Sequence, residues 1–172
     1  AKIFDPAIEV VYATDVVSFA KESGLFDKAK KDAEFSFTDT YNPADYGAVR
    51  FCESRVWSVF RRVNATMEKY FAYVNGDSND KMPLYIKPDK KLSAHDVMEL
   101  MRDHFEGTPF DMTKDVGAGP YACPYRWRPM EWDIDSVKYV HERAISTQQT
   151  GFSFVAQSRG WLPAPIGGII WF

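Results

Sequence analysis

Cysteine is scarce in this sequence: only Cys52 and Cys123 occur among its 172 residues. Two thiols are too few for a disulfide framework or for a zinc site built from cysteines. The sequence contains no run of 18 apolar residues and opens with no signal-peptide pattern, so we expect no transmembrane helix and no membrane partner. The cellular compartment, cytoplasmic or exported, stays open.

The sequence also lacks an excess of positive charge, with 21 Lys and Arg residues against 24 Asp and Glu residues. The formal net charge is −3 and the sequence pI is about 5.6. A nucleic-acid-binding domain usually shows a basic face or a pI above about 9, so we expect no nucleic-acid partner. The patterns G-x-x-x-x-G-K-[ST] and G-x-G-x-x-G are both missing, and the glycines of the chain therefore form no phosphate-binding loop of either kind.

Apolar and aromatic residues, by contrast, are plentiful. They make up 45% and 16% of the sequence, which favours a packed globular protein over a disordered one. The sequence begins at Ala1 and ends in the apolar run Gly-Gly-Ile-Ile-Trp-Phe, with no polar turn to close it. We therefore interpret residues 1–172 as a single-domain segment of a longer protein, truncated at both ends.

Three helices are predicted. The first covers residues 16–22, between capping candidates at 14 and 15 and a glycine at 24. The second begins at Asn42-Pro43 and runs to about Val63, with an apolar face at three- and four-residue steps: Tyr46, Val49, Cys52, Val56, Val59, Phe60 and Val63. On that face Cys52 is interpreted as an ordinary core residue. Ser93 starts the third helix, with Asp96 in capping-box spacing.

Short segments rich in β-branched and aromatic residues predict strands. In the first part of the chain, 70–74 is predicted as a short strand, 35–38 as a brief strand or extended piece, 84–86 as extended, and 8–13 as an edge strand or loop. Near the C-terminus the predicted strands are 144–147, 151–158 and 166–172. Residues 134–141 are predicted as a short helix. Helices thus dominate the first two thirds and antiparallel strands the C-terminal end, so the predicted fold class is α+β.

The most distinctive stretch runs from Met101 to Pro129, MRDHFEGTPFDMTKDVGAGPYACPYRWRP. Irregular connections of this length are uncommon in compact domains and, when ordered, are usually functional. We therefore predict that the stretch forms the wall of a substrate site. Its acidic and histidine residues could supply metal ligands, but the spacing matches no zinc or calcium motif, and the simpler interpretation is a helix end with its own hydrogen bonds: Asp103, His104, Glu106 and Asp111.

Arg126 has an aromatic neighbour on each side, Tyr125 and Trp127, which would sheathe its stem and direct its guanidinium. An arginine suits the carboxylate of a peptide, because it donates two parallel hydrogen bonds. Alternatively, Arg126 stacks on Trp127 or Trp132 and merely braces the loop. The sequence leaves both interpretations open.

Several blocks of the sequence resemble the dipeptidases of peptidase family C69, and together they span most of the chain. They are Asn42-Pro43, RFCESRVW at 50–57, RDHFEGTPFDMT at 102–113, GPY at 119–121, PYRW at 124–127, RAIST at 143–147 and QSRGWLP at 157–163. The resemblance implies part of an N-terminal-nucleophile hydrolase, whose αββα fold places two antiparallel sheets between helical layers. It also implies a bacterial cysteine peptidase that cleaves dipeptides through an acyl-enzyme, without metal or cofactor. In that family the nucleophile is a cysteine at the mature N-terminus, and its own α-amino group is the base.

The chain departs from this pattern at its start, because residue 1 is alanine and neither cysteine takes the nucleophile's place. We therefore expect the chain alone to be catalytically inert and the nucleophile to lie in the rest of the parent polypeptide. Related acylases have an arginine in a Pro-x-Arg-aromatic setting, so the resemblance makes Arg126 the candidate catalytic group. The residues predicted to bind a small peptide substrate are Asp103, His104, Glu106 and Tyr125.

Two alternatives stay open. The chain could be a stand-alone α+β ligand-binding or interaction module without catalysis, with the 101–129 loop as its site. It could also be an enzyme active as it stands, with Cys123 as nucleophile and His104 or His141 as its partner, because a nearby arginine lowers a thiol's pKa. The sequence fixes neither the preferred dipeptide nor the oligomeric state, and a homo-oligomer is compatible with it.

Overall fold

The computed structural model describes residues 12–126 and 131–172. The chain divides into two compact units, Ala1–Val49 and Arg50–Phe172, and each is treated by itself. Most of the predicted edge strand or loop at 8–13, and Trp127 beside Arg126, lie outside the described residues.

The first unit is a small helical assembly. Helix α1 (Val16–Glu22) has the predicted bounds, and Gly24 follows it with a φ of 72°, although the Asp15 side chain makes no capping hydrogen bond. A 3₁₀ turn (Asp32–Glu34) and the short helices α2 (Phe37–Tyr41) and α3 (Tyr46–Ala48) come next. The buried side chains of this unit form one apolar cluster, with Val17 and Ala20 from α1 and Phe26 and Phe35 from the segments that follow it.

Two predictions for this unit need correction. The extended conformation predicted at 35–38 holds for Phe35 and Ser36, but α2 replaces it from Phe37, because the Ser36 hydroxyl accepts a hydrogen bond from the backbone N–H of Asp39 and caps a helix there. The next helix does not begin at Asn42-Pro43. Asn42 ends α2, and Asp45 caps α3 by accepting the Ala48 N–H at 2.7 Å.

The second unit begins with a π-helical turn (Val49–Glu53) that leads into α4 (Ser54–Val63), whose end matches the prediction. The predicted buried face is only partly right, because Val49 is buried but other positions on that face are not. Trp57 is fully buried and donates its indole N–H to the Met67 carbonyl at 3.1 Å, while Cys52 and Val56 are exposed. A buried Trp removes more apolar surface from water than a single valine does, and the extra residue of the π turn changes which side chains face the core.

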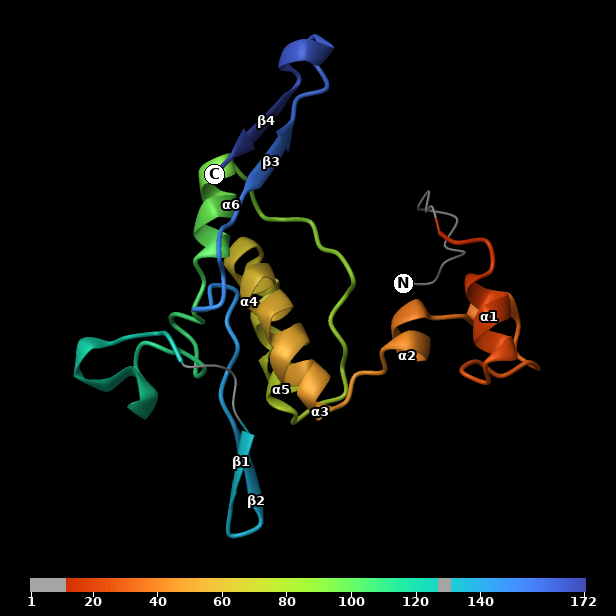
Figure 1. The fold of residues 1–172 in the computed structure, drawn as a ribbon, viewed down its shortest axis with the longest axis horizontal. Helices are drawn as coiled ribbons and strands as arrows, with labels where there is room; N and C mark the ends of the chain where they lie inside the picture. Colours follow the sequence, from red (N-terminus) through yellow and green to blue (C-terminus); the bar gives the residue numbers. More distant parts are fainter. Residues whose placement is uncertain (1–11, 127–130) are drawn as a thin grey trace. The chain divides into compact units, whose positions relative to one another are not determined.

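The predicted strand at 70–74 is also wrong. Asn64 accepts the Thr66 N–H at 2.9 Å and caps a 3₁₀ helix (Ala65–Tyr70), which continues into α5 (Phe71–Asn75). Gly76, with a φ of 90°, ends that helix. Figure 1 shows α5 beside α4, which it contacts. No strand forms at Leu84–Ile86, which follow in an irregular segment.

Helix α6 (Ala94–Met101) confirms the predicted capping box. Ser93 accepts the Asp96 N–H at 3.1 Å, and Asp96 in return accepts the Ser93 N–H at 2.8 Å. This backbone hydrogen bond, with the one from the Ser93 hydroxyl, lowers the pKa of Asp96 to about 2. The helix ends at Met101, so the predicted irregular stretch begins where expected.

Two antiparallel hairpins supply the strands. Strands β1 (Glu131–Ile134) and β2 (Val137–Val140) replace the helix predicted at 134–141. Asp135 and Ser136 have φ values of 49° and 66°, the left-handed pair that a two-residue hairpin turn requires. Trp132 stacks on Tyr139 directly across the pair, with ring centroids 5.9 Å apart.

Strands β3 (Val155–Ser158) and β4 (Gly168–Trp171) confirm the last two predicted strands at shorter length, whereas residues 144–147 form none. Helix α6 contacts β3 (Figure 1). Helices with small antiparallel strand pairs are consistent with the α+β class. The four-layer αββα arrangement stays a prediction.

The core of the second unit is an aromatic cluster beneath the 101–126 stretch. Trp57 and Phe71 meet Phe110 with ring centroids 6.1 and 5.2 Å apart, and Phe105 meets Phe110 at 5.9 Å. Both Phe105 and Phe110 belong to the stretch, so it is anchored in the core by its own side chains. In the described part of the chain, no helix is long and apolar enough to cross a bilayer.

Candidate functional site

The 103–112 segment is a tight loop closed by its own backbone. Phe105 adopts a φ of 64° although it is fully buried, and Gly107 has a φ of 74°. The Met112 N–H donates to the His104 carbonyl at 3.2 Å and joins the two ends of the loop. A bulky residue with positive φ costs of the order of 1–3 kcal/mol and persists where surrounding contacts enforce it, often at functional sites.

Asp103 is fully buried at the start of this loop. Its Oδ1 accepts a hydrogen bond from Arg62 Nη1 at 2.7 Å, and its backbone carbonyl accepts the Ser146 N–H at 3.2 Å. Within the described residues its Oδ2 has no hydrogen-bond partner. Because a buried carboxylate is costly without a counter-charge, Arg62 fixes where the loop begins.

His104, Glu106 and Tyr125 lie together. The Glu106 carboxylate accepts the His104 backbone N–H at 2.8 Å and stands 3.1 Å from His104 Nδ1. The His104 ring meets Tyr125 edge to face, with centroids 5.5 Å apart. Partial burial by itself raises the pKa of Glu106, but the hydrogen bonds from His104 outweigh it and lower that pKa. The carboxylate thereby favours an Nδ1–H tautomer and fixes the ring's orientation.

Asp111 is the most heavily hydrogen-bonded carboxylate of the loop. Oδ1 accepts from the N–H and the hydroxyl of Thr113, at 3.0 and 2.5 Å, and Oδ2 accepts the Gly107 N–H at 3.0 Å. Burial alone would raise the pKa of Asp111, yet these bonds and nearby Lys114 lower it to about 2. A role as a metal ligand would have to compete with these donors, and no metal-binding group of three such side chains occurs among the described residues.

Arg126 turns its guanidinium into the loop. Nη2 donates to the Met112 carbonyl at 3.0 Å and to Asp115, and Nη1 donates to the Cys123 carbonyl at 2.8 Å. Gly117 makes room for it, because a Cβ there would stand 2.6 Å from Arg126 Nε. Arg126 therefore braces this loop through hydrogen bonds, whereas the sequence analysis considered bracing through aromatic stacking. The catalytic role of Arg126 stays a prediction.

The structure thus gathers the four predicted substrate-binding residues at one turn. Asp103 and Glu106 share Arg62, which lies 3.8 Å from Glu106 Oε2, and His104 links Glu106 to Tyr125. Arg62, with Arg61 donating to the Glu106 carbonyl at 2.6 Å, was missed by sequence reasoning. The signal was present as two adjacent arginines in the last turn of a helix, facing an acidic loop only in three dimensions.

The two cysteines do not join this site. Cys52, predicted to be buried, is exposed, and so is Cys123. The ring of His104, one of the histidines considered as a partner for Cys123, is instead engaged by Glu106 and Tyr125.

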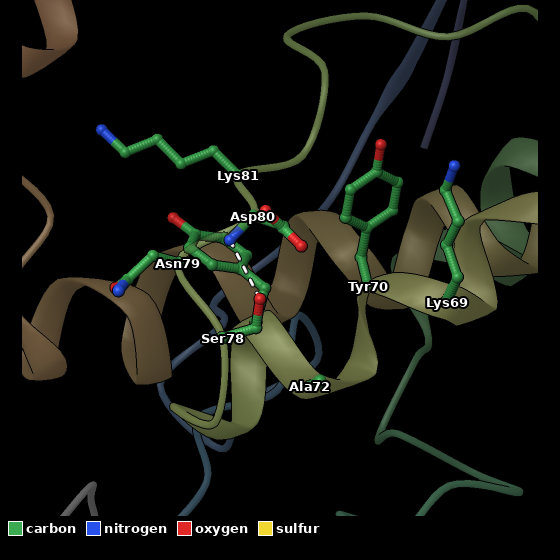
Figure 2. A pocket seen from close by; sticks show the side chains of 8 residues that line it. Lys69, Tyr70, Ala72, Ser78, Asn79, Asp80 and Lys81 are labelled. Atoms are coloured by element: carbon green, nitrogen blue, oxygen red, sulfur yellow. Dashed lines mark hydrogen bonds between the residues drawn. The ribbon is translucent and has the colours of Figure 1, made fainter.

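A hollow in the described part of the chain lies elsewhere, at the end of α5. It has a volume of about 680 Å³ and is lined by residues on both sides of the turn after that helix: Lys69, Tyr70, Ala72, Tyr73, Ser78, Asn79, Asp80 and Lys81. Figure 2 shows the Ser78 hydroxyl turned toward the Asp80 N–H, which donates to it at 3.1 Å. Its charged side chains are exposed, and no residue of the 101–126 stretch is among those that line it.

Comparison with known proteins identifies the chain. The family model described as peptidase family C69 matches residues 3–172. The chain is similar to a probable dipeptidase from Salmonella dublin, with 27% identity over 168 residues. That match covers 96% of this chain but 33% of the relative, so the chain spans about one third of that relative's length. No solved structure matches. The sequence over nearly its whole length, including the loop that carries the clustered residues, therefore belongs to peptidase family C69.

Proposed function

We propose that this chain is part of a dipeptidase that hydrolyses short peptides through a cysteine acyl-enzyme. The observation that carries the proposal is the family match over residues 3–172, together with the dipeptidase name of the Salmonella relative. The relative is about three times as long as the matched region, so the catalytic cysteine is proposed to lie in the parent polypeptide outside this chain.

In the proposed reaction, the thiolate of an N-terminal cysteine attacks the peptide carbonyl carbon, and the thiol's proton passes to the α-amino group of the same residue. The tetrahedral intermediate collapses, the amine leaves with that proton, and a thioester remains. Water then adds to the thioester and releases the second product and the thiol. Neither Cys52 nor Cys123 is assigned this role.

The loop around His104 is proposed to form one wall of the substrate site. The side chains of Glu106 and Tyr125 are about half exposed and can contact a peptide, whereas Asp103 is fully buried and acts through the loop it anchors. His104 holds both exposed groups in place. Arg126 is proposed to contribute positive charge close to the scissile carbonyl.

The test uses the full-length polypeptide and a set of dipeptides. Replacing the upstream N-terminal cysteine by alanine is expected to abolish hydrolysis, and hydrolysis that survives this change refutes the mechanism. Tyr125→Ala is expected to raise KM, because half of its side chain faces solvent at the proposed wall. Tyr121→Ala is the matched control, since Tyr121 belongs to the same stretch and is 91% exposed.

A further inference from the structure

A second, smaller cavity lies between helix α6 and the β3–β4 hairpin. Its volume is about 180 Å³, and its lining is mainly methionine and aromatic: Met98, Met101, Arg102, Ser146, Ser153, Phe154, Val155, Trp171 and Phe172. That volume equals the liquid volume of about six water molecules. It is enough for one leucine or phenylalanine side chain and too small for a larger ligand to be enclosed.

The chemistry of the lining is that of a site for an apolar group. Two methionines provide a soft, adaptable wall, and Phe154 and Trp171 remain 54% and 41% exposed. Exposed apolar surface gathered around a concavity is typical of ligand and partner sites. The polar residues that line this cavity are few: Ser146, Ser153 and one cation, Arg102.

Arg102 is available to a ligand. Its guanidinium pairs with Glu99 at 2.6 Å, but the Arg102 side chain is 64% exposed. An ion pair this exposed contributes little stability, so a carboxylate brought by a ligand can replace Glu99 at small cost. A cation beside an apolar cavity suits a molecule with a hydrophobic side chain close to a carboxylate.

This cavity is joined to the loop of the candidate site. Met101 and Arg102 line the cavity, and the next residue is Asp103. Ser146 also lines it, and its N–H donates to the Asp103 carbonyl at 3.2 Å. The same backbone contact therefore fixes both the cavity wall and the start of the loop that carries His104 and Glu106.

From these contacts we infer that the cavity between α6 and the β3–β4 hairpin binds the hydrophobic side chain of a peptide substrate, with Arg102 receiving the peptide's carboxylate. The inference rests on the proposed peptidase function and adds a substrate class to it: dipeptides with a leucine-like or phenylalanine-like residue. Burying one such side chain is expected to raise kcat/KM at least about 10-fold over glycine.

The experiment compares the full-length protein on Gly-Gly with its activity on Leu-Gly, Gly-Leu and Gly-Phe. Phe154→Ala removes part of the wall, and Met101→Trp fills the cavity. Both residues are partly exposed, at 54% and 38%, so neither change is expected to prevent folding. The matched control is Phe152→Ala, because Phe152 is 76% exposed and does not belong to the lining.

A preference of about 10-fold or more for hydrophobic dipeptides, reduced to within about 3-fold by both lining changes and kept by the control, supports the inference. Arg102→Gln should raise KM for free dipeptides while leaving their C-terminal amides less affected. A native enzyme without hydrophobic preference, or a preference that survives both lining changes, overturns it.

The inference and the proposed function fail differently. If the full-length protein hydrolyses no dipeptide, the proposed function is refuted. Calorimetric titration with Gly-Phe then tests whether the cavity binds a hydrophobic dipeptide. Saturable binding that Phe154→Ala weakens and Phe152→Ala retains supports the site. The inference is overturned if Gly-Phe does not bind, or if Gly-Phe and Gly-Gly bind equally. Absence of binding includes the case in which another part of the polypeptide fills the cavity.

Discussion

Asp111 offers the sharpest test of how the 103–113 loop is held. Asp111→Asn keeps the shape of the side chain but removes its charge. It also places an amide N–H₂ where an oxygen now accepts. If Oδ1 is retained toward Thr113, the new amide faces the Gly107 N–H, so that two donors oppose each other at a position where Oδ2 accepts at 3.0 Å.

The size of the expected loss in stability follows from the pKa of Asp111, which is lowered from 3.8 to about 2. A difference of this size corresponds to about 2 kcal/mol of stability at neutral pH, since each pKa unit is worth about 1.4 kcal/mol. The opposed donors at Gly107 add about 1 kcal/mol or more. We therefore expect Asp111→Asn to lower the free energy of unfolding by about 3 kcal/mol or more at pH 7.

The lowered pKa of Asp111 also determines how its contribution to stability changes with pH. Because the folded-state pKa of Asp111 lies below its unfolded value, the ionised carboxylate stabilises the fold above about pH 4. This contribution is lost as the pH falls toward 2. The difference in unfolding free energy between native and Asp111→Asn proteins, measured by urea unfolding, should therefore be largest at pH 6–7. At pH 2–3 it should shrink to the part caused by the two donors that oppose each other at Gly107.

The result that refutes this reasoning is a difference in unfolding free energy that is the same at pH 7 and pH 3, or absent at both. Asp80→Asn is the matched control. Asp80 is exposed, and its carboxylate accepts no hydrogen bond within the part of the chain that the structure describes. That change is expected to stay within about 0.5 kcal/mol at either pH.

Three further changes test other contacts. Arg62→Gln leaves the fully buried Asp103 without its counter-charge and should cost about 3 kcal/mol of unfolding free energy in a urea titration. Gly117→Ala brings a Cβ to 2.6 Å from Arg126 Nε, and because that arginine is buried and held by Met112, the change should cost about 1–3 kcal/mol by the same measurement. Ser93→Ala removes the cap of α6 and should cost about 1 kcal/mol, with faster hydrogen exchange in the first turn.

Two of these changes, at Arg62 and at Gly117, have a control that separates the proposed cause from general damage. Asp103→Asn combined with Arg62→Gln should recover part of the loss, because no uncompensated charge then stays buried; a purely additive double mutant contradicts the ion-pair account. Gly151→Ala meets nothing within 4 Å and should be neutral. Equal losses at Gly117 and Gly151 would show that the close approach to Arg126 is not the reason.

Local signals predicted part of this fold. The capping box of α6 follows from two side chains three residues apart. The bounds of α1 and the C-terminal end of α4 were likewise predicted from nearby residues, although no side chain caps the start of α1. The prediction failed at the Asp135-Ser136 hairpin, because the pattern of nearby residues does not decide there between a helix and a strand. Val137 and Val140 fit a helical spacing as well as a strand, and the deciding factor is two left-handed residues that are neither Gly nor Asn.

The buried face of α4 shows a second limit. The sequence placed Cys52 on the core side because it follows Val49 at a helical step, but a π turn at Val49–Glu53 inserts a residue and changes the phase. The buried side includes Arg50, whose guanidinium lies 4.0 Å from the Phe110 ring centroid and pairs with Glu142 at 2.6 Å. Periodicity cannot anticipate this, because the partners lie about 60 and 90 residues further along the chain.

The candidate site repeats this division between local and distant causes. Composition alone was enough to select the 101–129 stretch, and within it the proximity of His104 to Glu106 is a local effect of two residues' separation. The groups that fix the loop in space are not local: Arg62 comes from α4 and Ser146 from beyond the β1–β2 hairpin. Sequence reasoning finds the groups that we propose to meet a substrate, because these gather in one irregular segment, but it misses those that hold the segment. A variant at Arg62 should therefore weaken the site as strongly as a variant within the loop, although no motif of the loop contains it.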